Sequence, residues 1–337
     1  MIEALYVVEM RSRRVIEGEF FELETSGISV IIPHYNHGDV IRRQLNAIRR
    51  QTLEADEIIV VDDFSPADKL AEVIEAASEI PTARVVRKEK NDGAARACNV
   101  GLAESRGAYV CFLACDDEIL PDLFRTAVHF LDTHRKASFV FFDPAVINPH
   151  NGEIRTFPLF LSDIPTFIDA TEMERVLSKN FFTFSTNTII FRRSRLDGGM
   201  PANLGSFADN FLDFRLALTT GAVYVPKVMG YFYEYPDSYS SKKTLNATVV
   251  RKLTNSFLET LEDNETADLY ARFRNVGVLP EHSLRAILWL LTTPRGRRYI
   301  TSRLILRNLT RSAWRIARPL APHGIRQLMR RVSARRV

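Results

Sequence analysis

The sequence predicts an α/β fold built on a mostly parallel sheet flanked by helices. From Gly27 onward, short β-branched runs alternate with stretches of helical spacing, and this rhythm favours right-handed crossovers between parallel strands. Polar clusters directly follow three of the predicted strands. Because ligands of such sheets bind outside the carboxyl ends of the strands, these clusters predict one site at one sheet edge.

The predicted elements can be placed in order from their apolar patterns. Short runs rich in Val, Ile and Phe indicate buried strands, and apolar spacing of three or four residues indicates helices. Strands are expected at 28–32, 57–61, 84–86, 109–113 and 139–142, and helices at 40–50, 66–78, 94–104 and 121–134. After residue 145 the rhythm loosens, with strands expected at 183–191, 222–225 and 229–233 and a helix at 207–218.

The composition is that of an ordinary globular protein, with 46% hydrophobic and 26% charged residues. Cys98, Cys111 and Cys115 show no CxxC spacing and no disulfide framework, which favours a reducing, cytoplasmic location. Cys111 and Cys115 lie in or just past an apolar run, which favours buried thiols at these two positions. The N-terminus lacks the layout of a signal peptide, and no window approaches the roughly 18 apolar residues that span a bilayer. We therefore expect no membrane-spanning segment.

The charge is concentrated at the C-terminus. Residues 281–337 contain fourteen Arg, no Lys and one acid, so they carry +13 and leave −9 for the rest of a chain whose net charge is +4. Five arginines fall on one helical face, namely Arg303, Arg307, Arg311, Arg315 and Arg318. The opposite face carries Ile305, Leu306, Leu309, Ala313, Ile316 and Ala317.

This pattern predicts a basic amphipathic helix that lies on an anionic membrane surface. The alternative is a terminal helix that packs on the body of the protein through its apolar face. No recognised nucleic-acid module accompanies the charge, so we expect no nucleic-acid partner.

The turn after the first predicted strand carries the first candidate residues. Pro33, Tyr35 and Asn36 stand where a dinucleotide-binding enzyme has a glycine fingerprint, and the absence of that fingerprint argues against an NAD dehydrogenase. A ring face and an amide suit a nucleotide base or ribose instead.

Asp62 and Asp63 end an otherwise apolar strand. A carboxylate at this edge can accept a hydrogen bond from a base N–H or a ribose hydroxyl, and we expect this role first of Asp62. The alternative is a helix cap, because Asp, Ser65 and Pro66 all favour helix entry.

Asp116 and Asp117 form an acidic pair just after another predicted strand. Mg²⁺ prefers hard oxygen ligands and usually binds one or two carboxylates together with substrate phosphates. A divalent cation here would neutralise charge on a departing diphosphate. The alternative is an N-cap for the helix that follows Pro121.

Five motifs occur in a fixed order. They read SVIIPHYN (29–36), EIIVVDDFSPAD (57–68), NDGAARACNVGL (91–102), GAYVCFLACDDEILPD (107–122) and SFADNFLDFRLAL (206–218). In this order and spacing, residues 27–240 resemble glycosyltransferase family 2. The resemblance implies a GT-A-like fold, a nucleotide-sugar donor, a divalent cation (Mg²⁺ or Mn²⁺) and transfer with inversion at the sugar carbon.

The resemblance also implies roles for individual residues. Pro33, Tyr35 and Asp62 match positions that hold the base and ribose, and Arg96 matches a region that lines the nucleotide. Asp116 matches the last acid of the family's Asp-x-Asp metal motif. Asp209 matches the catalytic base at the start of the acceptor-side helix, although it also suits an N-cap.

The sequence departs from the family pattern at two places. Ala114 stands where the first acid of Asp-x-Asp is expected, so the metal and ribose contacts fall to Asp116 and Asp117. The family often has a His after its last strand, and residues 233–241 contain none. Glu234 and Asp237 are the available substitutes.

The expected organisation is an N-terminal extension at 1–26, a catalytic domain at 27–240 and a helical C-terminal region with a basic tail at 241–337. The expected donor is a UDP-sugar, and the expected acceptor is a glycan or lipid-linked glycan of a cell-surface polysaccharide. The expected location is the cytoplasmic face of the membrane. The alternatives are a non-catalytic member that binds nucleotide sugar or glycan, and a nucleotidyltransferase, whose Gly- and Lys-rich loop is absent from residues 33–38.

Overall fold

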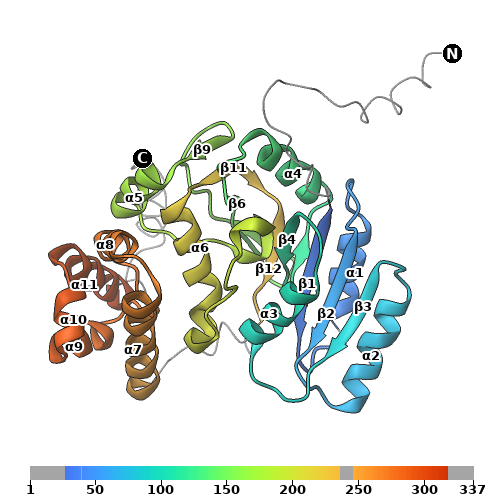
Figure 1. Cartoon of the computed structure of the whole chain (residues 1–337), viewed down its shortest axis with the longest axis horizontal. Helices are drawn as coiled ribbons and strands as arrows, with labels where there is room; N and C mark the ends of the chain where they lie inside the picture. Colours follow the sequence, from blue (N-terminus) through green and yellow to red (C-terminus); the bar gives the residue numbers. More distant parts are fainter. Residues whose placement is uncertain (1–26, 39, 236–245, 318–337) are drawn as a thin grey trace.

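The computed structural model describes residues 27–38, 40–235 and 246–317, without the side chains of 264 and 310–317. Within these residues the central sheet has eight strands in the order β3-β2-β1-β4-β10-β6-β11-β9 (Figure 1). Its strands are β1 (Ile28–His34), β2 (Glu57–Asp62), β3 (Ala83–Arg87), β4 (Tyr109–Phe112), β6 (Phe139–Asp143), β9 (Thr166–Ile168), β10 (Ile190–Arg192) and β11 (Ala222–Val228). A second sheet, in the order β5-β12-β7-β8, consists of β5 (Glu118–Ile119), β12 (Gly230–Tyr233), β7 (Ala145–Ile147) and β8 (Ile154–Thr156).

The first half of the central sheet is parallel, as predicted. Strand β1 pairs in parallel with β2 and β4, and β2 pairs in parallel with β3. The second half is mixed, because β10 runs antiparallel between β4 and β6, and β9 runs antiparallel to β11. The short strands β5, β7, β8 and β9 were not predicted, because two or three residues are too few for a clear periodicity.

The strand predicted at 183–191 is correct only at its end. Only β10 (Ile190–Arg192) joins the central sheet. Earlier in the predicted range the chain forms a 3₁₀ turn, η1 (Thr186–Thr188). The Thr188 hydroxyl donates to the Ser185 carbonyl at 3.2 Å. Side chains of Thr and Asn compete with strand pairing by making such local and lateral hydrogen bonds, which explains the failure of the pattern here.

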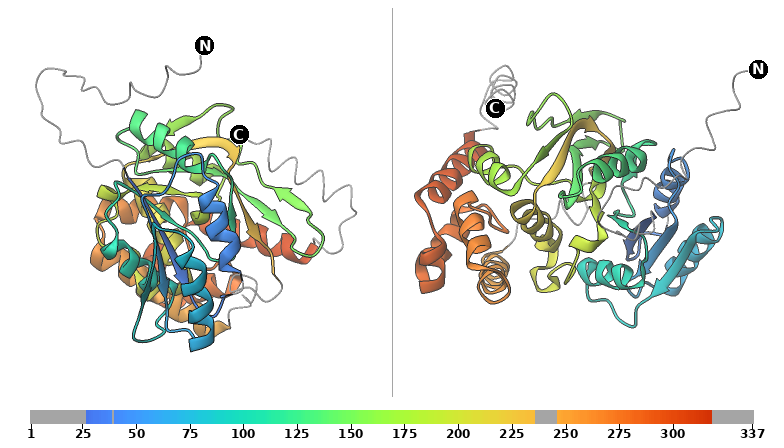
Figure 2. Two further views of the ribbon diagram at one scale, coloured as in Figure 1. Left: turned by 90° about the vertical axis from the view of Figure 1, so that its right-hand side faces the viewer. Right: turned by 45° about the horizontal axis from the view of Figure 1, so that its top comes forward.

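Helices cover both faces of the central sheet (Figure 2). Val30 and Ile32 belong to one buried cluster with side chains of α1 (Ile41–Arg49), α2 (Ala67–Ser78) and α4 (Leu123–Thr133). Ile31, which alternates with them, belongs to a second cluster with side chains of α3 (Ala94–Glu104), α5 (Ala170–Lys179) and α6 (Ala208–Thr219). The sheet is therefore buried on both faces, as its continuous apolar runs predict. Cys98, Cys111 and Cys115 are buried free thiols in these clusters, as expected of Cys111 and Cys115.

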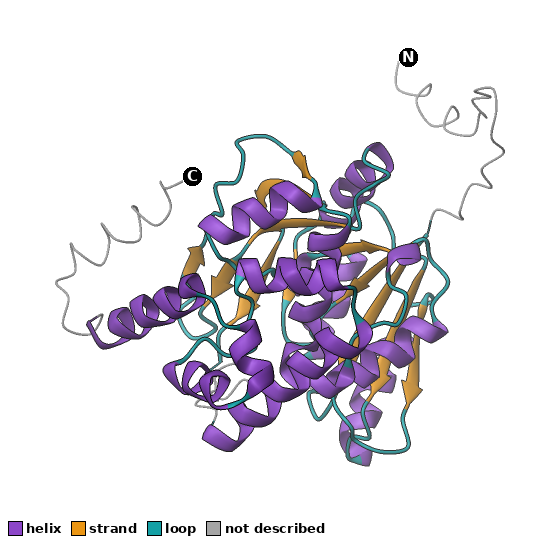
Figure 3. Cartoon of the chain, turned by 60° about the vertical axis from the view of Figure 1, so that its left-hand side comes forward, coloured by secondary structure: helices purple, strands orange, loops and turns teal. Residues whose placement is uncertain are grey.

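The C-terminal helices gather on the outer side of α6, away from β3 and α2 (Figure 1). They are α7 (Ala247–Asn264), α8 (Ala267–Val276), α9 (Leu284–Thr292), α10 (Pro294–Tyr299) and α11 (Ser302–Ala317). Figure 3 shows that the described part of the chain beside the C-terminus is helical. Phe257 and Phe273 pack on Phe211 of α6 with ring centroids 6.1 and 5.3 Å away. The described part of the predicted C-terminal region is thus helical and shares a core with α6. No helix among the described residues is long and apolar enough to cross a membrane.

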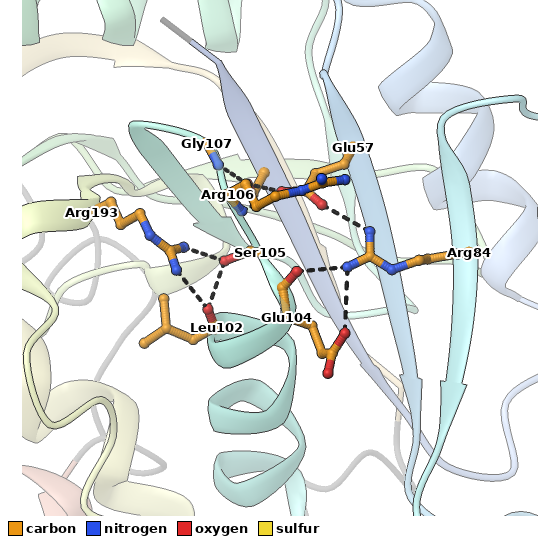
Figure 4. A network of polar contacts seen from close by, with 9 residues as sticks. Glu57, Arg84, Leu102, Glu104, Ser105, Arg106, Gly107 and Arg193 are labelled. Atoms are coloured by element: carbon orange, nitrogen blue, oxygen red, sulfur yellow. Dashed lines mark hydrogen bonds and ion pairs between the residues drawn. The ribbon is translucent and has the colours of Figure 1, made fainter. Parts of the chain in front are cut away.

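A polar network ties the amino ends of β1, β2 and β4 together (Figure 4). The Glu57 carboxylate accepts from the Ser29 hydroxyl at 2.6 Å and from the Arg84 guanidinium at 2.8 Å. Arg193 donates to the Leu102 carbonyl at 3.0 Å and thereby holds the end of α3. This network lies at the opposite strand ends from the predicted site, so we assign it to the framework of the fold.

Candidate active site

The carboxyl ends of β1, β2 and β4 meet at one edge of the sheet. His34 pairs in register with Asp62, and β4 lies on the other side of β1. Helix α3 approaches β1 closely, because a Cβ on Gly101 would lie 2.4 Å from Ile31 Cγ2. The strand ends therefore bring the predicted nucleotide-binding and metal-binding residues to the same edge.

Asp62 is fully buried at this edge. His34 Nδ1 lies 3.0 Å from Asp62 Oδ1, and the Ser65 backbone N–H donates to Oδ2 at 3.1 Å. Because His34 Nε2 accepts from the His37 backbone N–H at 3.1 Å, we assign the proton of the neutral ring to Nδ1. Burial lowers the pKa of His34. Both Asp62 oxygens have protein partners here, and its contact with a base or ribose stays a prediction.

The loop after β1 presents the other predicted nucleotide contacts. Tyr35 is 48% exposed, Pro33 is half-buried and Asn36 is exposed. Asn36 has a φ of 58° and its backbone N–H donates to the Ser65 hydroxyl at 2.9 Å. The loop is thus fixed by backbone contacts while its ring and amide side chains remain accessible.

Asp63 fixes the entry to α3. Its carboxylate accepts from the backbone N–H groups of Gly93 at 2.8 Å and Asp92 at 3.2 Å, and it pairs with Lys88 at 2.5 Å. Gly93 has a φ of 101°, a conformation that favours glycine. Asp63 therefore supports the segment that carries Arg96, whose side chain is 53% exposed. A direct contact of Asp63 with the nucleotide stays a prediction, as does that of Arg96.

Asp116 is half-buried at the site, and Arg43 of α1 donates to its carbonyl. The Arg43 guanidinium also lies over the Tyr233 ring, 3.6 Å from its centroid, and donates to the Tyr235 hydroxyl at 3.3 Å. Sequence reasoning missed Arg43 because nothing distinguishes it from the other arginines of its helix. Its charge lies beside the candidate metal ligand.

Asp117 points into the protein. Its carboxylate accepts from Asn187 Nδ2 and from the Tyr233 backbone N–H, both at 3.1 Å. Burial, together with the charge of Asp116, raises the pKa of Asp117 to about 8. The predicted contact between Asp117 and the donor stays a prediction, but this arrangement favours a supporting position behind Asp116.

Asp209 lies in the first turn of α6 and is half-buried. Its Oδ1 accepts from the Asn210 backbone N–H at 2.7 Å. Asp213, one turn further along, is completely buried, and the Thr186 hydroxyl donates to its Oδ2 at 2.8 Å. Burial, together with the charge of Asp209, raises the pKa of Asp213 well above its ordinary value. Asp209 is thus the accessible member of the pair.

The turn η1 connects the acidic pair at 116–117 with helix α6, which carries Asp209 and Asp213. Thr186 binds the carboxyl of Asp213 on α6, and the adjacent Asn187 binds the carboxyl of Asp117 beside Asp116. Sequence reasoning missed both residues, because a Thr-Asn-Thr run before a strand matches no chemical motif.

The acidic residues fit a cation that is held mainly by its substrate. Among the described residues no group of three His, Cys, Asp or Glu side chains is placed to hold a metal. Glu234 pairs with Arg155, and Asp237 lies outside the described residues. Since Mg²⁺ is commonly bound by one or two carboxylates plus substrate phosphates, Asp116 with a substrate diphosphate is the ligand set that we expect.

Comparison with known proteins points to the glycosyltransferase family that the five sequence motifs resemble. The family model described as glycosyl transferase family 2 matches residues 29–197. An uncharacterized glycosyltransferase of Haemophilus influenzae is 27% identical over 259 residues, which are 73% of this chain and 82% of that protein. The poly(ribitol-phosphate) beta-N-acetylglucosaminyltransferase TarS of Staphylococcus aureus is 27% identical over 61% of this chain, but the match spans only 35% of TarS.

Solved structures share the fold at low identity. TarS residues 1–349 in complex with UDP match with a TM-score of 0.53 and 21% identity over 82% of each chain. The mannosyltransferase PcManGT of Pyrobaculum calidifontis, in complex with GDP-Man and Mn²⁺, matches with a TM-score of 0.55 and 19% identity over 92% of this chain and 86% of that one. With the family model covering half of the sequence, the chain belongs to glycosyl transferase family 2 and has the GT-A fold.

Proposed function

We propose that the protein transfers a hexose from a UDP-sugar to a glycan hydroxyl with inversion at the sugar carbon. The observation that carries this proposal is the arrangement around η1, which holds the acidic pair at 116–117 and the Asp209 helix in one framework. The UDP complex of TarS supports the choice of nucleotide.

In the proposed reaction the acceptor oxygen attacks the anomeric carbon as the bond to the diphosphate breaks. Asp209 takes the proton of the attacking hydroxyl, which is the work of a general base. One base suffices, because a single in-line displacement inverts the carbon and needs no covalent intermediate. The nucleoside diphosphate leaves with the bonding electrons.

Asp116 is the residue that we expect to hold the divalent cation, which when bound would offset negative charge on the leaving diphosphate. We expect Tyr35, Pro33 and Asp62 to receive the base and ribose, and Arg96 to line the nucleotide. PcManGT, which was solved with Mn²⁺, supports the cation.

We further propose that the acceptor is lipid-linked, within cell-surface polysaccharide synthesis, and that the enzyme works on the cytoplasmic face of the membrane.

The structure corrects the orientation expected for the amphipathic helix, which is α11. The exposed Arg303 donates to the Asn275 carbonyl at 3.2 Å, and the Arg307 guanidinium lies 4.6 Å from the Phe181 ring, so both arginines contact the body of the protein. Leu306 and Leu309 are instead 63% and 49% exposed. The side chains of the other stripe arginines lie outside those described.

A panel of nucleotide sugars tests the proposed activity. We expect a UDP-sugar, with Mg²⁺ or Mn²⁺, to raise the melting temperature, because a ligand of the native state stabilises it by mass action. Transfer to an acceptor should then give a product of opposite anomeric configuration, read by NMR. Binding without transfer or hydrolysis would favour a non-catalytic member, and pyrophosphate release from a nucleoside triphosphate would favour a nucleotidyltransferase.

A further inference from the structure

Helix α9 is apolar on its outer as well as its inner side. Ala286, Ile287 and Leu290 are buried against the body of the protein. On the opposite side Leu284, Leu288 and Leu291 are 43%, 63% and 45% exposed. Exposed apolar side chains that gather on one face mark interaction sites with proteins or membranes, so this outer side suits a further apolar phase.

The first turns of α7 continue this surface. Val249 is 42% exposed, and a groove of about 370 Å³ between α7 and α9 has Arg251, Leu288 and Trp289 in its lining. The Trp289 indole N–H donates to Asn255 Oδ1 at 2.8 Å, and the Arg251 guanidinium lies 5.3 Å from its ring centroid. Arginine and tryptophan beside exposed leucines are the residues that proteins place at a membrane interface.

We propose that this surface, formed by Leu284, Leu288 and Leu291 of α9 with Val249 and Arg251 of α7, attaches the enzyme to an anionic lipid membrane. The proposal rests on the membrane association proposed above and moves the inserting element from the stripe at 303–318 to α9. The three leucines enter the acyl boundary, while the groove arginine meets lipid phosphate.

The charges favour lipid over the other possible occupants. Among its described lining residues the groove has Arg251 and Arg285 and no acid, and Lys252 follows Arg251 on α7. Arg295 and Arg298 of α10 pair instead with Glu259 and Glu262 of α7, so their charges are offset. The C-terminal residues 318–337 contain six Arg and no acid, so they would meet like charge on this surface. A second copy of the same surface would meet like charge too, whereas anionic headgroups complement it.

Vesicle binding of the full-length chain tests the proposal. Trp289 and Trp314 are the two tryptophans of the sequence, so a Trp314→Phe variant leaves Trp289 as a fluorescence reporter within the surface. We expect a blue shift of its emission with vesicles of phosphatidylglycerol and phosphatidylcholine, and none with phosphatidylcholine alone. An unchanged spectrum with the anionic vesicles would overturn the proposal.

Substitution of the leucines separates this surface from the rest of the chain. We expect the double variant Leu288→Gln, Leu291→Gln to bind anionic vesicles at least about tenfold more weakly. The matched control is Ile74→Gln, which changes a side chain that is 50% exposed on α2, on the opposite side of the molecule (Figure 1). The control should bind like the parent.

Three readouts keep the outcomes distinct. Parental vesicle binding by the double variant would overturn the proposal, and so would a change in its oligomeric state by light scattering, which would assign the surface to a second copy. Transfer to a soluble acceptor should be the same in the double variant and the parent. If the parent and all variants lack transfer activity while the parent still binds anionic vesicles, the proposed enzymatic function is wrong and the proposed membrane surface is retained.

Discussion

Asn187 and Asp117 are joined by a hydrogen bond of 3.1 Å between Nδ2 and Oδ2, although they lie 70 residues apart in the chain. Both side chains are buried. The neighbouring Thr186 makes the equivalent contact with Asp213 at 2.8 Å. Two adjacent residues of one turn thus hold one carboxyl next to Asp116 in the chain and another one helical turn from Asp209.

The variants Asn187→Ala and Thr186→Val should affect different kinetic constants. Each removes one hydrogen bond to a buried carboxyl, which costs about 1–3 kcal/mol locally. We expect Asn187→Ala mainly to raise the KM for donor and cation, about tenfold, and Thr186→Val mainly to lower kcat. Steady-state kinetics on variants with measured melting temperatures provide the test. Equal effects of both variants on both constants would show that η1 is only structural.

Asp116→Ala should abolish transfer and cation-dependent donor binding together. The reason is that Asp116 is the half-buried member of the acidic pair, whereas Asp117 is bonded to Asn187 and Tyr233. Titration calorimetry with UDP, with and without Mn²⁺, measures the binding. Parental Mn²⁺-dependent affinity in the variant would place the cation elsewhere.

Asp209→Asn should leave donor affinity unchanged and lower kcat by at least ~10²-fold, the low end for a lost general base. Asp213→Asn is the matched control. Because burial raises the pKa of Asp213 well above its ordinary value and favours the uncharged form, an amide of the same shape should preserve most of the turnover. A large loss in the Asp213 variant with near-parental turnover in the Asp209 variant would exchange their roles.

The stability of the protein should fall as the pH drops below about 6.5 through His34. Burial lowers the pKa of His34 from its ordinary value of 6.5, so the unfolded chain takes up a proton that the folded protein does not. The contribution is therefore complete above pH 6.5 and decreases on acidification, by at most about 1.4 kcal/mol per pH unit for one group. Denaturant unfolding at several pH values measures it.

The titratable groups whose charges act on His34 are Asp62, His37 and Glu72. Replacement of His34 by Gln preserves a donor toward Asp62 but removes the titrating ring. A His34→Gln variant should therefore lose this part of the pH dependence, and a pH profile identical to that of the parent would contradict the assignment.

The sequence by itself determined the framework of the site. The continuous apolar runs of β1, β2 and β4 are buried on both faces, and the polar residues that follow them meet at one edge, as predicted. The strands follow from apolar patterns among neighbouring residues, which are visible in the sequence. The common edge follows because parallel strands end on the same side of the sheet. The family followed from five motifs of this kind, and the family model matches residues 29–197.

Only the tertiary structure decided which carboxylates are accessible. Asp116 and Asp117 are adjacent and chemically identical in the sequence, as are Asp209 and Asp213 one helical turn apart, yet each pair has one half-buried and one buried member. Asn187 and Thr186 donate to the buried members, Asp117 and Asp213. Both residues belong to the turn η1, where the sequence pattern predicted a strand. Burial and hydrogen bonding across 27 and 70 residues set these environments, and such long-range contacts leave no periodic trace in the sequence.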